Sequence, residues 1–159
     1  MVDPVLNFCS DAEYHNFMEG VTGFERDMAR QGTILVKLYF SVTKQKQAER
    51  FQRDKSDPLR RWKQSELDVQ AQERWDDFTN VKYEMLKKTH NSCAPWTVIR
   101  SNNKYKARLN VIKTILNSVP YTRLDEDLDF VPDSDIVCSG AHEIEMMDIQ
   151  KSSKGKFLS

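Results

Sequence analysis

Residues 34–40 read Ile34-Leu35-Val36-Lys37-Leu38-Tyr39-Phe40, and this stretch decides the fold class. It is a short, almost continuous run of β-branched and aromatic residues between Gly32 and the segment Ser41-Val42-Thr43. A continuous apolar run of this length is typical of a strand that is buried on both faces. Strands of that kind occur in parallel sheets that helices cover on both sides, so the stretch predicts an α/β protein.

Helical patterns lie on both sides of this predicted strand. Ser10-Asp11-Ala12-Glu13 is a capping-box pattern, and the apolar spacing that follows predicts a helix up to Gly32. After the strand, Thr43 is expected to cap a second helix that ends before Asp57-Pro58, because the residue before a proline avoids the helical conformation. The expected core contacts of this second helix are Ala48 and Phe51.

A third helical pattern begins at Ser65-Glu66-Leu67-Asp68 and predicts one long helix to about Thr89. Trp96-Thr97-Val98-Ile99 then predicts a second strand. The last predicted helix, about residues 104–119, has one apolar face made of Tyr105, Leu109, Ile112, Ile115, Leu116 and Val119. Two strands cannot complete a parallel sheet, so we expect strands from another stretch of polypeptide to pair here.

The composition limits the classes of function. The 159 residues include 24 Lys and Arg and 24 Asp and Glu, so no overall basic charge favours nucleic-acid binding. The charge is nevertheless uneven, because residues 44–63 are strongly basic whereas residues 125–148 are acidic and contain no Lys or Arg. Three scattered cysteines and the lack of a leader or membrane-spanning run predict a cytoplasmic protein without membrane contact.

Several short motifs occur in a fixed order along the chain. They are Asp57-Pro58-Leu59-Arg60-Arg61-Trp62-Lys63, Arg74-Trp75-Asp76-Asp77-Phe78-Thr79, Ala94-Pro95-Trp96-Thr97-Val98-Ile99-Arg100-Ser101-Asn102 and Ala107-Arg108-Leu109-Asn110. In this order they resemble the C-terminal half of the polyphosphate kinase 2 family over about residues 2–121, with a looser match at residues 132–137. The resemblance implies a partial P-loop-kinase-like three-layer sandwich with parallel strands, flanking helices and a helical lid at about residues 44–89. Residues 1–121 would form this part of the domain, and residues 122–159 are expected to be an acidic, poorly ordered tail.

The basic loop between the second and third helices is the first candidate site. Arginine suits phosphate binding because its planar fork donates two hydrogen bonds at once and keeps its charge. Composition alone favours the alternative that these are ordinary surface cations on a solvated face. The resemblance implies a lid over a phosphate channel, and the residues expected to contact polyphosphate are Arg53, Arg60, Arg61 and Lys63.

The second candidate site is Ser101-Asn102-Asn103-Lys104, which follows the second strand where ligands bind in parallel α/β sheets. The residues expected to contact a nucleotide are Ser101, Asn102, Lys104 and Arg108. A loop that merely caps the next helix, with Ser101 and Asn102 as the caps, is the alternative. Asn103 departs from the aspartate that is usual in the family, which puts a nucleotide contact by that residue in doubt.

Asp77 is a candidate for orienting the lid arginines, and a surface ion pair with Arg74 or Lys82 is the alternative. No residue is assigned a catalytic role, and the His and Cys spacings do not indicate a metal site. The chain also contains no Gly-x-x-x-x-Gly-Lys motif.

The resemblance implies a polyphosphate:nucleotide phosphotransferase that acts on nucleoside diphosphates or triphosphates, with Mg²⁺ whose ligands lie outside this chain. We expect this chain to be a truncated, non-catalytic portion that forms a homo-oligomer or joins a partner chain with the N-terminal half. A non-enzymatic polyphosphate- or nucleotide-binding module, or one half of a split kinase, is the alternative.

Overall fold

The computed structural model describes residues 1–63, 65–122 and 127–157. Two strands, β1 (Lys37–Ser41) and β2 (Trp96–Arg100), are parallel and pair in register from Lys37 opposite Trp96 to Ser41 opposite Arg100. A third strand, β3 (Val137–Ser139), pairs antiparallel with β2, so the sheet is mixed and has the order β1-β2-β3. The predicted parallel pair is confirmed, although the first strand begins at Lys37 and leaves Ile34 51% exposed.

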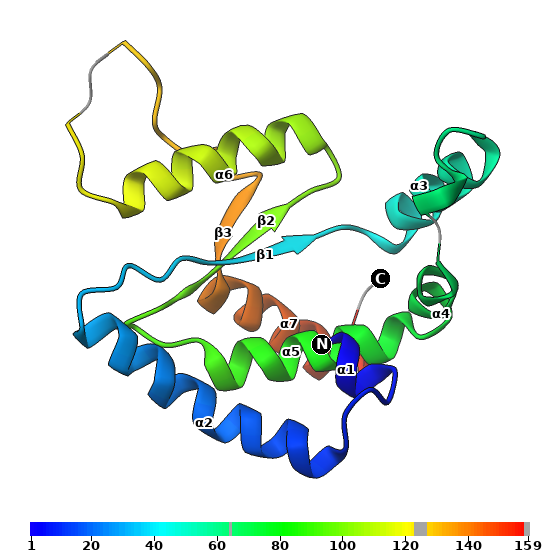
Figure 1. Cartoon of the computed structure of the whole chain (residues 1–159), viewed down its shortest axis with the longest axis horizontal. Helices are drawn as coiled ribbons and strands as arrows, with labels where there is room; N and C mark the ends of the chain where they lie inside the picture. Colours follow the sequence, from blue (N-terminus) through cyan, green and yellow to red (C-terminus); the bar gives the residue numbers. More distant parts are fainter. Residues whose placement is uncertain (64, 123–126, 158–159) are drawn as a thin grey trace.

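Helices cover both faces of the sheet, as the sequence predicted. Figure 1 shows α6 (Lys104–Ser118) on one face and, on the other, α2 (Asp11–Arg30), α5 (Trp75–Thr89) and α7 (Gly140–Lys154). The short α1 (Val2–Val5) lies beside α5, whereas α3 (Lys44–Ser56), η1 (Arg61–Lys63) and α4 (Glu66–Glu73) extend beyond the carboxyl end of β1. The three-layer α/β architecture is therefore confirmed. No helix within the described ranges is long and apolar enough to cross a membrane.

The predicted caps position these helices. The Ser10 side chain accepts a hydrogen bond from the Glu13 backbone N–H, and Glu13 accepts one from the Ser10 N–H at 2.8 Å, which completes the capping box at the start of α2. Thr43 Oγ1 accepts from the Lys46 N–H at 3.3 Å, and α3 ends at Ser56 as predicted. Ala48 is exposed, so its predicted core contact is wrong, because α3 projects away from the sheet (Figure 1).

The predicted helix over residues 65–89 is divided in two. At Arg74 the backbone has φ −99° and ψ 29°, and α4 ends there while α5 begins at the next residue. The two parts have different neighbours, since α4 contacts α3 and α5 contacts α1, α2 and α7. The division therefore follows from packing and not from a helix-breaking residue.

Helix α6 is buried on a different face from the predicted one. Ala107 and Asn110 are its buried residues, and Val111 packs against a core cluster formed by Ile99, Ala107 and Ile136. The predicted apolar face is exposed, with Tyr105 82%, Leu109 55%, Ile112 55% and Ile115 40% accessible. Leu116 and Val119 of that face are only partly buried, so the prediction that this face packs against the core is wrong.

The C-terminal segment is not a poorly ordered tail where the structure describes it. Ile136 is buried, β3 pairs with β2, and α7 follows from Gly140. The acidic residues of α7 have cationic partners, since Lys82 Nζ lies 2.5 Å from Glu143 Oε1 and Lys87 Nζ lies 3.8 Å from Asp148 Oδ1. The expectation of disorder is therefore wrong for residues 137–154, because the acidic pattern did not show these partners.

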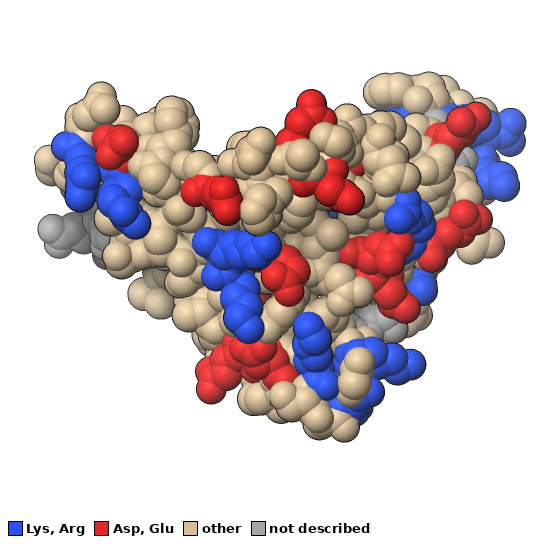
Figure 2. All heavy atoms as spheres, turned by 90° about the horizontal axis from the view of Figure 1, so that it is seen from below, with Lys and Arg blue, Asp and Glu red and all other residues tan. Residues whose placement is uncertain are grey.

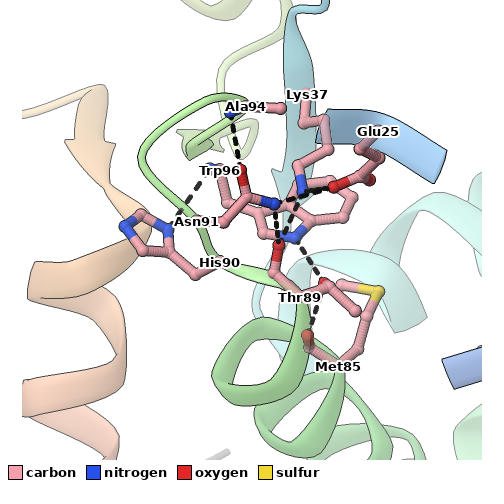
Figure 3. A network of polar contacts seen from close by, with 8 residues as sticks. All are labelled: Glu25, Lys37, Met85, Thr89, His90, Asn91, Ala94 and Trp96. Atoms are coloured by element: carbon pink, nitrogen blue, oxygen red, sulfur yellow. Dashed lines mark hydrogen bonds and ion pairs between the residues drawn. The ribbon is translucent and has the colours of Figure 1, made fainter. Parts of the chain in front are cut away.

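A buried polar network holds α2, β1 and the end of α5 together (Figure 3). Lys37 Nζ donates to Glu25 Oε2 and to the Thr89 carbonyl, at 2.7 Å each. Asn91 Nδ2 also donates to Glu25 Oε2 at 2.9 Å, and Trp96 Nε1 donates to Thr89 Oγ1 at 2.8 Å. The network fixes the start of β1 against the helical layer, at the opposite end of the strand from Ser41.

Candidate functional site

A basic cleft of about 780 Å³ lies at the carboxyl ends of β1 and β2, which is the usual ligand side of a parallel sheet. Helix α3 forms one wall, and the loop of residues 101–104 with the start of α6 forms the other. The lining residues are Lys46, Glu49, Arg50, Arg53, Asn102, Asn103, Lys104 and Tyr105. Four of these are cationic and only Glu49 is anionic, so the cleft favours an anionic ligand.

This positive charge is local. On the face of the molecule seen in Figure 2, cationic and anionic side chains are interspersed and form no single large field. The equal numbers of 24 basic and 24 acidic residues in the whole chain agree with that distribution. The cations that line the cleft are therefore a local cluster and not part of a large positive surface.

Hydrogen bonds fix the 101–104 loop to both neighbouring elements. The backbone N–H and the hydroxyl of Ser101 donate to the Ser41 carbonyl at 2.7 and 2.8 Å. Asn102 Oδ1 accepts from the Thr43 N–H at 3.0 Å. From α3, Arg50 Nη2 donates to the carbonyls of Ser101 and Asn102 at 2.5 and 3.0 Å. The loop is thus held to β1 and to α3 at the same time.

Asn103 is the N-cap of α6. Its Oδ1 accepts from the backbone N–H groups of Tyr105 and Lys106 at 3.0 and 3.2 Å. The loop thus caps α6, but through Asn103 and not through Ser101 or Asn102 as the alternative had it, and asparagine is among the residues preferred at that position.

The cations in the cleft repel one another. Partial burial, followed by the charges of Arg50 and Arg53, lowers the pKa of Lys104, and Arg108 adds a smaller effect of the same sign. A bound anion would oppose this repulsion and stabilise the charged ammonium. The electrostatics of Lys104 therefore favour a ligand that carries negative charge.

The four residues predicted to contact polyphosphate lie in two places. Arg53 lines the basic cleft, and its guanidinium pairs with Asp54 at 3.2 Å. The other three follow α3 on the loop and η1: Arg60 Nε lies 2.9 Å from Asp57 Oδ2, Arg61 Nε donates to the Lys55 carbonyl at 3.0 Å, and the Lys63 ammonium lies 5.5 Å from the centre of the Trp62 ring. These three are not among the residues that line the cleft.

Two of the four residues predicted to contact a nucleotide lie on the opposite wall of the cleft. Asn102 and Lys104 line the cleft, whereas the Ser101 hydroxyl is bonded to Ser41. Arg108 lies one turn farther along α6 and is exposed. The structure thus brings Lys104 and Arg53 to one cleft, although the sequence assigned them to different ligands.

Asp77 lies outside the cleft. Its Oδ2 is 2.9 Å from Arg74 Nε, which is the surface pairing that the sequence left open as the alternative. A role in orienting the lid arginines stays a prediction.

Sequence reasoning missed Lys46, Arg50 and Tyr105 as lining residues. The spacing of Lys46, Arg50 and Arg53 is four and then three residues, which places all three side chains on one face of a helix. That spacing could have separated the cleft-facing cations from the other basic residues of the segment.

A second cavity of about 670 Å³ lies between the end of β1 and the helices α1, α4, α5 and α7. Its lining is largely apolar and includes Tyr39, Phe40, Trp75, Phe78 and Met146. Burial, with a further contribution from the Glu143 charge, raises the pKa of Tyr39 to about 12. Trp75 and Phe78 line this cavity beside the carboxyl end of β1.

Across residues 1–63, 65–122 and 127–157, no three His, Cys, Asp or Glu side chains are grouped so that they could hold a metal ion. The described residues thus do not form a Mg²⁺ site made by protein side chains alone.

Comparison with known proteins decides the family. The model of the family described as Polyphosphate kinase 2 matches residues 1–127. The chain belongs to the polyphosphate kinase 2 family. It is 40% identical over 131 residues to a putative GDP-polyphosphate phosphotransferase of Corynebacterium glutamicum, with 82% of this chain and 41% of the relative covered. It is 39% identical over 144 residues to NDP-polyphosphate phosphotransferase 2 of Ruegeria pomeroyi, with 91% of this chain and 42% of the relative covered.

The structure agrees with this membership. The crystal structure of polyphosphate kinase 2 from Arthrobacter aurescens superposes with a TM-score of 0.69 at 27% identity, and the match covers 80% of this chain and 47% of that one. This polyphosphate kinase 2 chain therefore spans less than half the length of the relatives that it matches.

Proposed function

We propose that the basic cleft binds the phosphates of polyphosphate and of a nucleotide, and that the chain is the lid- and nucleotide-loop part of a polyphosphate:nucleotide phosphotransferase. One observation carries this proposal: Arg50, Arg53 and Lys104 face one cleft at the carboxyl ends of two parallel strands. The relatives named above are described as phosphotransferases for GDP or nucleoside diphosphates with polyphosphate, which supports these ligands.

The arrangement suits phosphoryl transfer, which is catalysed mainly by positioning and by neutralising charge. Polyphosphate would extend along α3 from Arg53 toward Arg60, Arg61 and Lys63. The nucleotide phosphates would lie against Asn102 and Lys104, with Ser101 holding the loop and Arg108 adding positive charge. Asp77 would orient the lid arginines when the lid closes.

We further propose that phosphoryl transfer needs polypeptide beyond these 159 residues, either in a partner chain with a P-loop or in a homo-oligomer. Two surfaces support this: the described residues provide no strand along the outer edge of β1, and Leu109 and Ile112 on α6 are each 55% exposed. Mg²⁺ would enter with the phosphates and with ligands from that additional polypeptide. One half of a split kinase is the second candidate, and these two surfaces favour it over a binding module that acts alone. A cytoplasmic location belongs to the same proposal.

Titration calorimetry with long-chain polyphosphate, and separately with ADP and GDP, tests the proposed ligands. Lys46→Ala combined with Lys104→Ala removes one cation from each wall of the cleft and should weaken polyphosphate binding at least tenfold, because hydrogen bonds to charged groups contribute about 1.5–3 kcal/mol each. Lys87→Ala combined with Lys88→Ala, at the far end of α5, removes the same charge and is the matched control. Equal losses in the two double variants would contradict binding in the cleft.

A transfer assay tests the need for additional polypeptide. The pure chain, mixed with polyphosphate, Mg²⁺ and ADP, should form no ATP, and activity should appear when a chain with a P-loop is added. ATP formation by the pure chain alone would overturn this part of the proposal.

A further inference from the structure

Arg50 links the two walls of the basic cleft. It lies on α3, between Lys46 and Arg53 on the face that lines the cleft, yet its Nη2 donates to two consecutive carbonyls of the opposite wall. Those carbonyls belong to Ser101 and Asn102, directly before the cap of α6. Both bonds come from Nη2, whose two N–H groups lie in the rigid plane of the guanidinium, so together they fix the orientation of the side chain as well as its distance.

A second tether acts beside it. The Thr43 N–H, at the N-cap of α3, donates to Asn102 Oδ1 at 3.0 Å. Asn102 is thus bonded twice to α3 and its cap, once through its side chain and once through its carbonyl. Asn103, the next residue, accepts from the N–H groups of Tyr105 and Lys106. A shift of α3 would therefore be transmitted to the 101–104 loop and to the first turn of α6.

Arg50 keeps its charge available to the cleft. Among the described residues, no carboxylate forms an ion pair with it, whereas Arg53 is paired with Asp54. Its charge also helps to lower the pKa of Lys104 across the cleft. An anion in the cleft would meet the same guanidinium that holds the loop.

From this geometry we infer that Arg50 is a positioning residue that couples polyphosphate binding on α3 to nucleotide binding at the 101–104 loop. Polyphosphate that draws Arg50 and Arg53 together orders α3, and the two tethers then order the loop that receives the nucleotide. Each ligand raises the affinity for the other, because coupling between two sites is reciprocal. The assignment of the two ligands rests on the proposed function, whereas the tether itself does not.

Amide hydrogen exchange of the ligand-free chain tests the tether. In Arg50→Gln the Thr43, Tyr105 and Lys106 amides should exchange several-fold faster than in the unchanged chain, because the loop that orders them is released. Arg26→Gln, an exposed arginine on α2, is the matched control and should leave these three amides unaffected. Unaltered exchange in Arg50→Gln would overturn the inference whether or not any ligand binds.

The coupling itself is measured as a ratio. The dissociation constant of ADP is determined by calorimetry without polyphosphate and with saturating polyphosphate. The dissociation constant without polyphosphate, divided by the one with polyphosphate, should be about five or more in the unchanged chain, within the range usual for coupled sites. It should fall to near one in Arg50→Gln and also in Arg50→Lys, since a lysine keeps the charge but lacks the planar fork. A ratio does not change when a variant merely weakens one ligand, so it separates coupling from loss of charge.

The possible outcomes are distinguishable. Full coupling in Arg50→Lys would show that charge alone suffices and would overturn the positioning role. Polyphosphate that weakens ADP binding in the unchanged chain would show competition for the cleft and would also overturn it. If the unchanged chain binds neither ligand, the proposed function and the coupling both fail, and the exchange experiment still decides whether Arg50 holds the loop.

Discussion

The ammonium group of Lys37 lies 2.7 Å from Glu25 Oε2, and both side chains are less than a tenth exposed, at 7% and 9%. The pair joins the first residue of β1 to α2, and Lys37 also lies over the Trp96 ring at 4.9 Å. The positive charge of Lys37, at the start of β1, is thereby compensated by the carboxylate of Glu25. Because the two charges are desolvated together, the loss of one leaves the other buried without a partner.

Lys37→Met should therefore lower the free energy of unfolding by about 3–5 kcal/mol, the range found when one member of a buried pair is removed. Urea unfolding followed by circular dichroism measures the change. The double variant Lys37→Met with Glu25→Leu should recover most of the loss, because neither charge then remains buried. Arg30→Ala is the control, since its pair with Asp27 is exposed and should contribute less than about 1 kcal/mol. A Lys37→Met chain as stable as the unchanged one would contradict this account.

The sequence predicted the elements better than it predicted their surroundings. The caps at Ser10 and Thr43 and the parallel pairing of β1 with β2 depend on local chemistry and on chain connectivity, and all were recovered. For α6 the periodicity identified an apolar face, but the buried residues are Ala107 and Asn110. Which face a helix buries depends on its neighbours, and periodicity alone does not contain that information.

The site shows the same limit. Residue type and position after a strand placed Lys104 in the cleft, whereas the role of Arg50 depends on two carbonyls 51 and 52 residues away in sequence. No local pattern marks such a contact. The partners of Glu143 and Asp148 are 61 and 65 residues away in sequence, so the acidic composition of the segment did not reveal them and wrongly predicted a disordered tail.

Polyphosphate binding should weaken as salt increases, because each neutralised phosphate releases counterions. Arg60→Ala with Arg61→Ala should reduce both the affinity at low salt and the slope against salt concentration, if these two arginines extend the cleft as proposed. Fluorescence anisotropy with labelled polyphosphate at several salt concentrations measures both quantities. Lys87→Ala with Lys88→Ala again removes two positive charges elsewhere, and an equal effect in that control would remove the lid assignment.

Lys104→Ala should weaken nucleotide binding about tenfold and polyphosphate binding less, because Lys104 lies on the loop side of the cleft. Calorimetric titration of each ligand separately provides the comparison. Lys106→Ala, two residues farther along α6, keeps the Asn103 cap and serves as the control. The opposite ranking, with polyphosphate affected more than ADP, would mean that the two ligand assignments are exchanged.

Tyr39 makes the stability of the chain depend on pH in the alkaline range. Its pKa is raised to about 12 in the folded state, whereas an unfolded tyrosine titrates near 10. The folded state thus holds the phenolic proton of Tyr39 more tightly than the unfolded state does. This contribution to the free energy of unfolding is fully present below pH 10 and is lost as the pH rises toward 12. The loss should be about 2–3 kcal/mol. Urea unfolding at pH 9 and pH 11.5 measures it, and Tyr39→Phe should remove most of the difference. An unchanged pH dependence in Tyr39→Phe would assign the effect to other groups.

The exposed face of α6 should drive association of the isolated chain. Tyr105, Leu109 and Ile112 are 82%, 55% and 55% exposed on one side of the helix, and within the described residues β1 pairs along one edge only. Contiguous apolar surface and an open strand edge both favour contact with another polypeptide. Sedimentation velocity should therefore show oligomers, and Leu109→Lys with Ile112→Glu should shift them toward monomer without a change in net charge. Leu59→Lys, on the loop after α3 and 84% exposed, is the control for a single apolar residue outside that face. A chain that sediments as a stable monomer before any substitution would show that these surfaces need no partner.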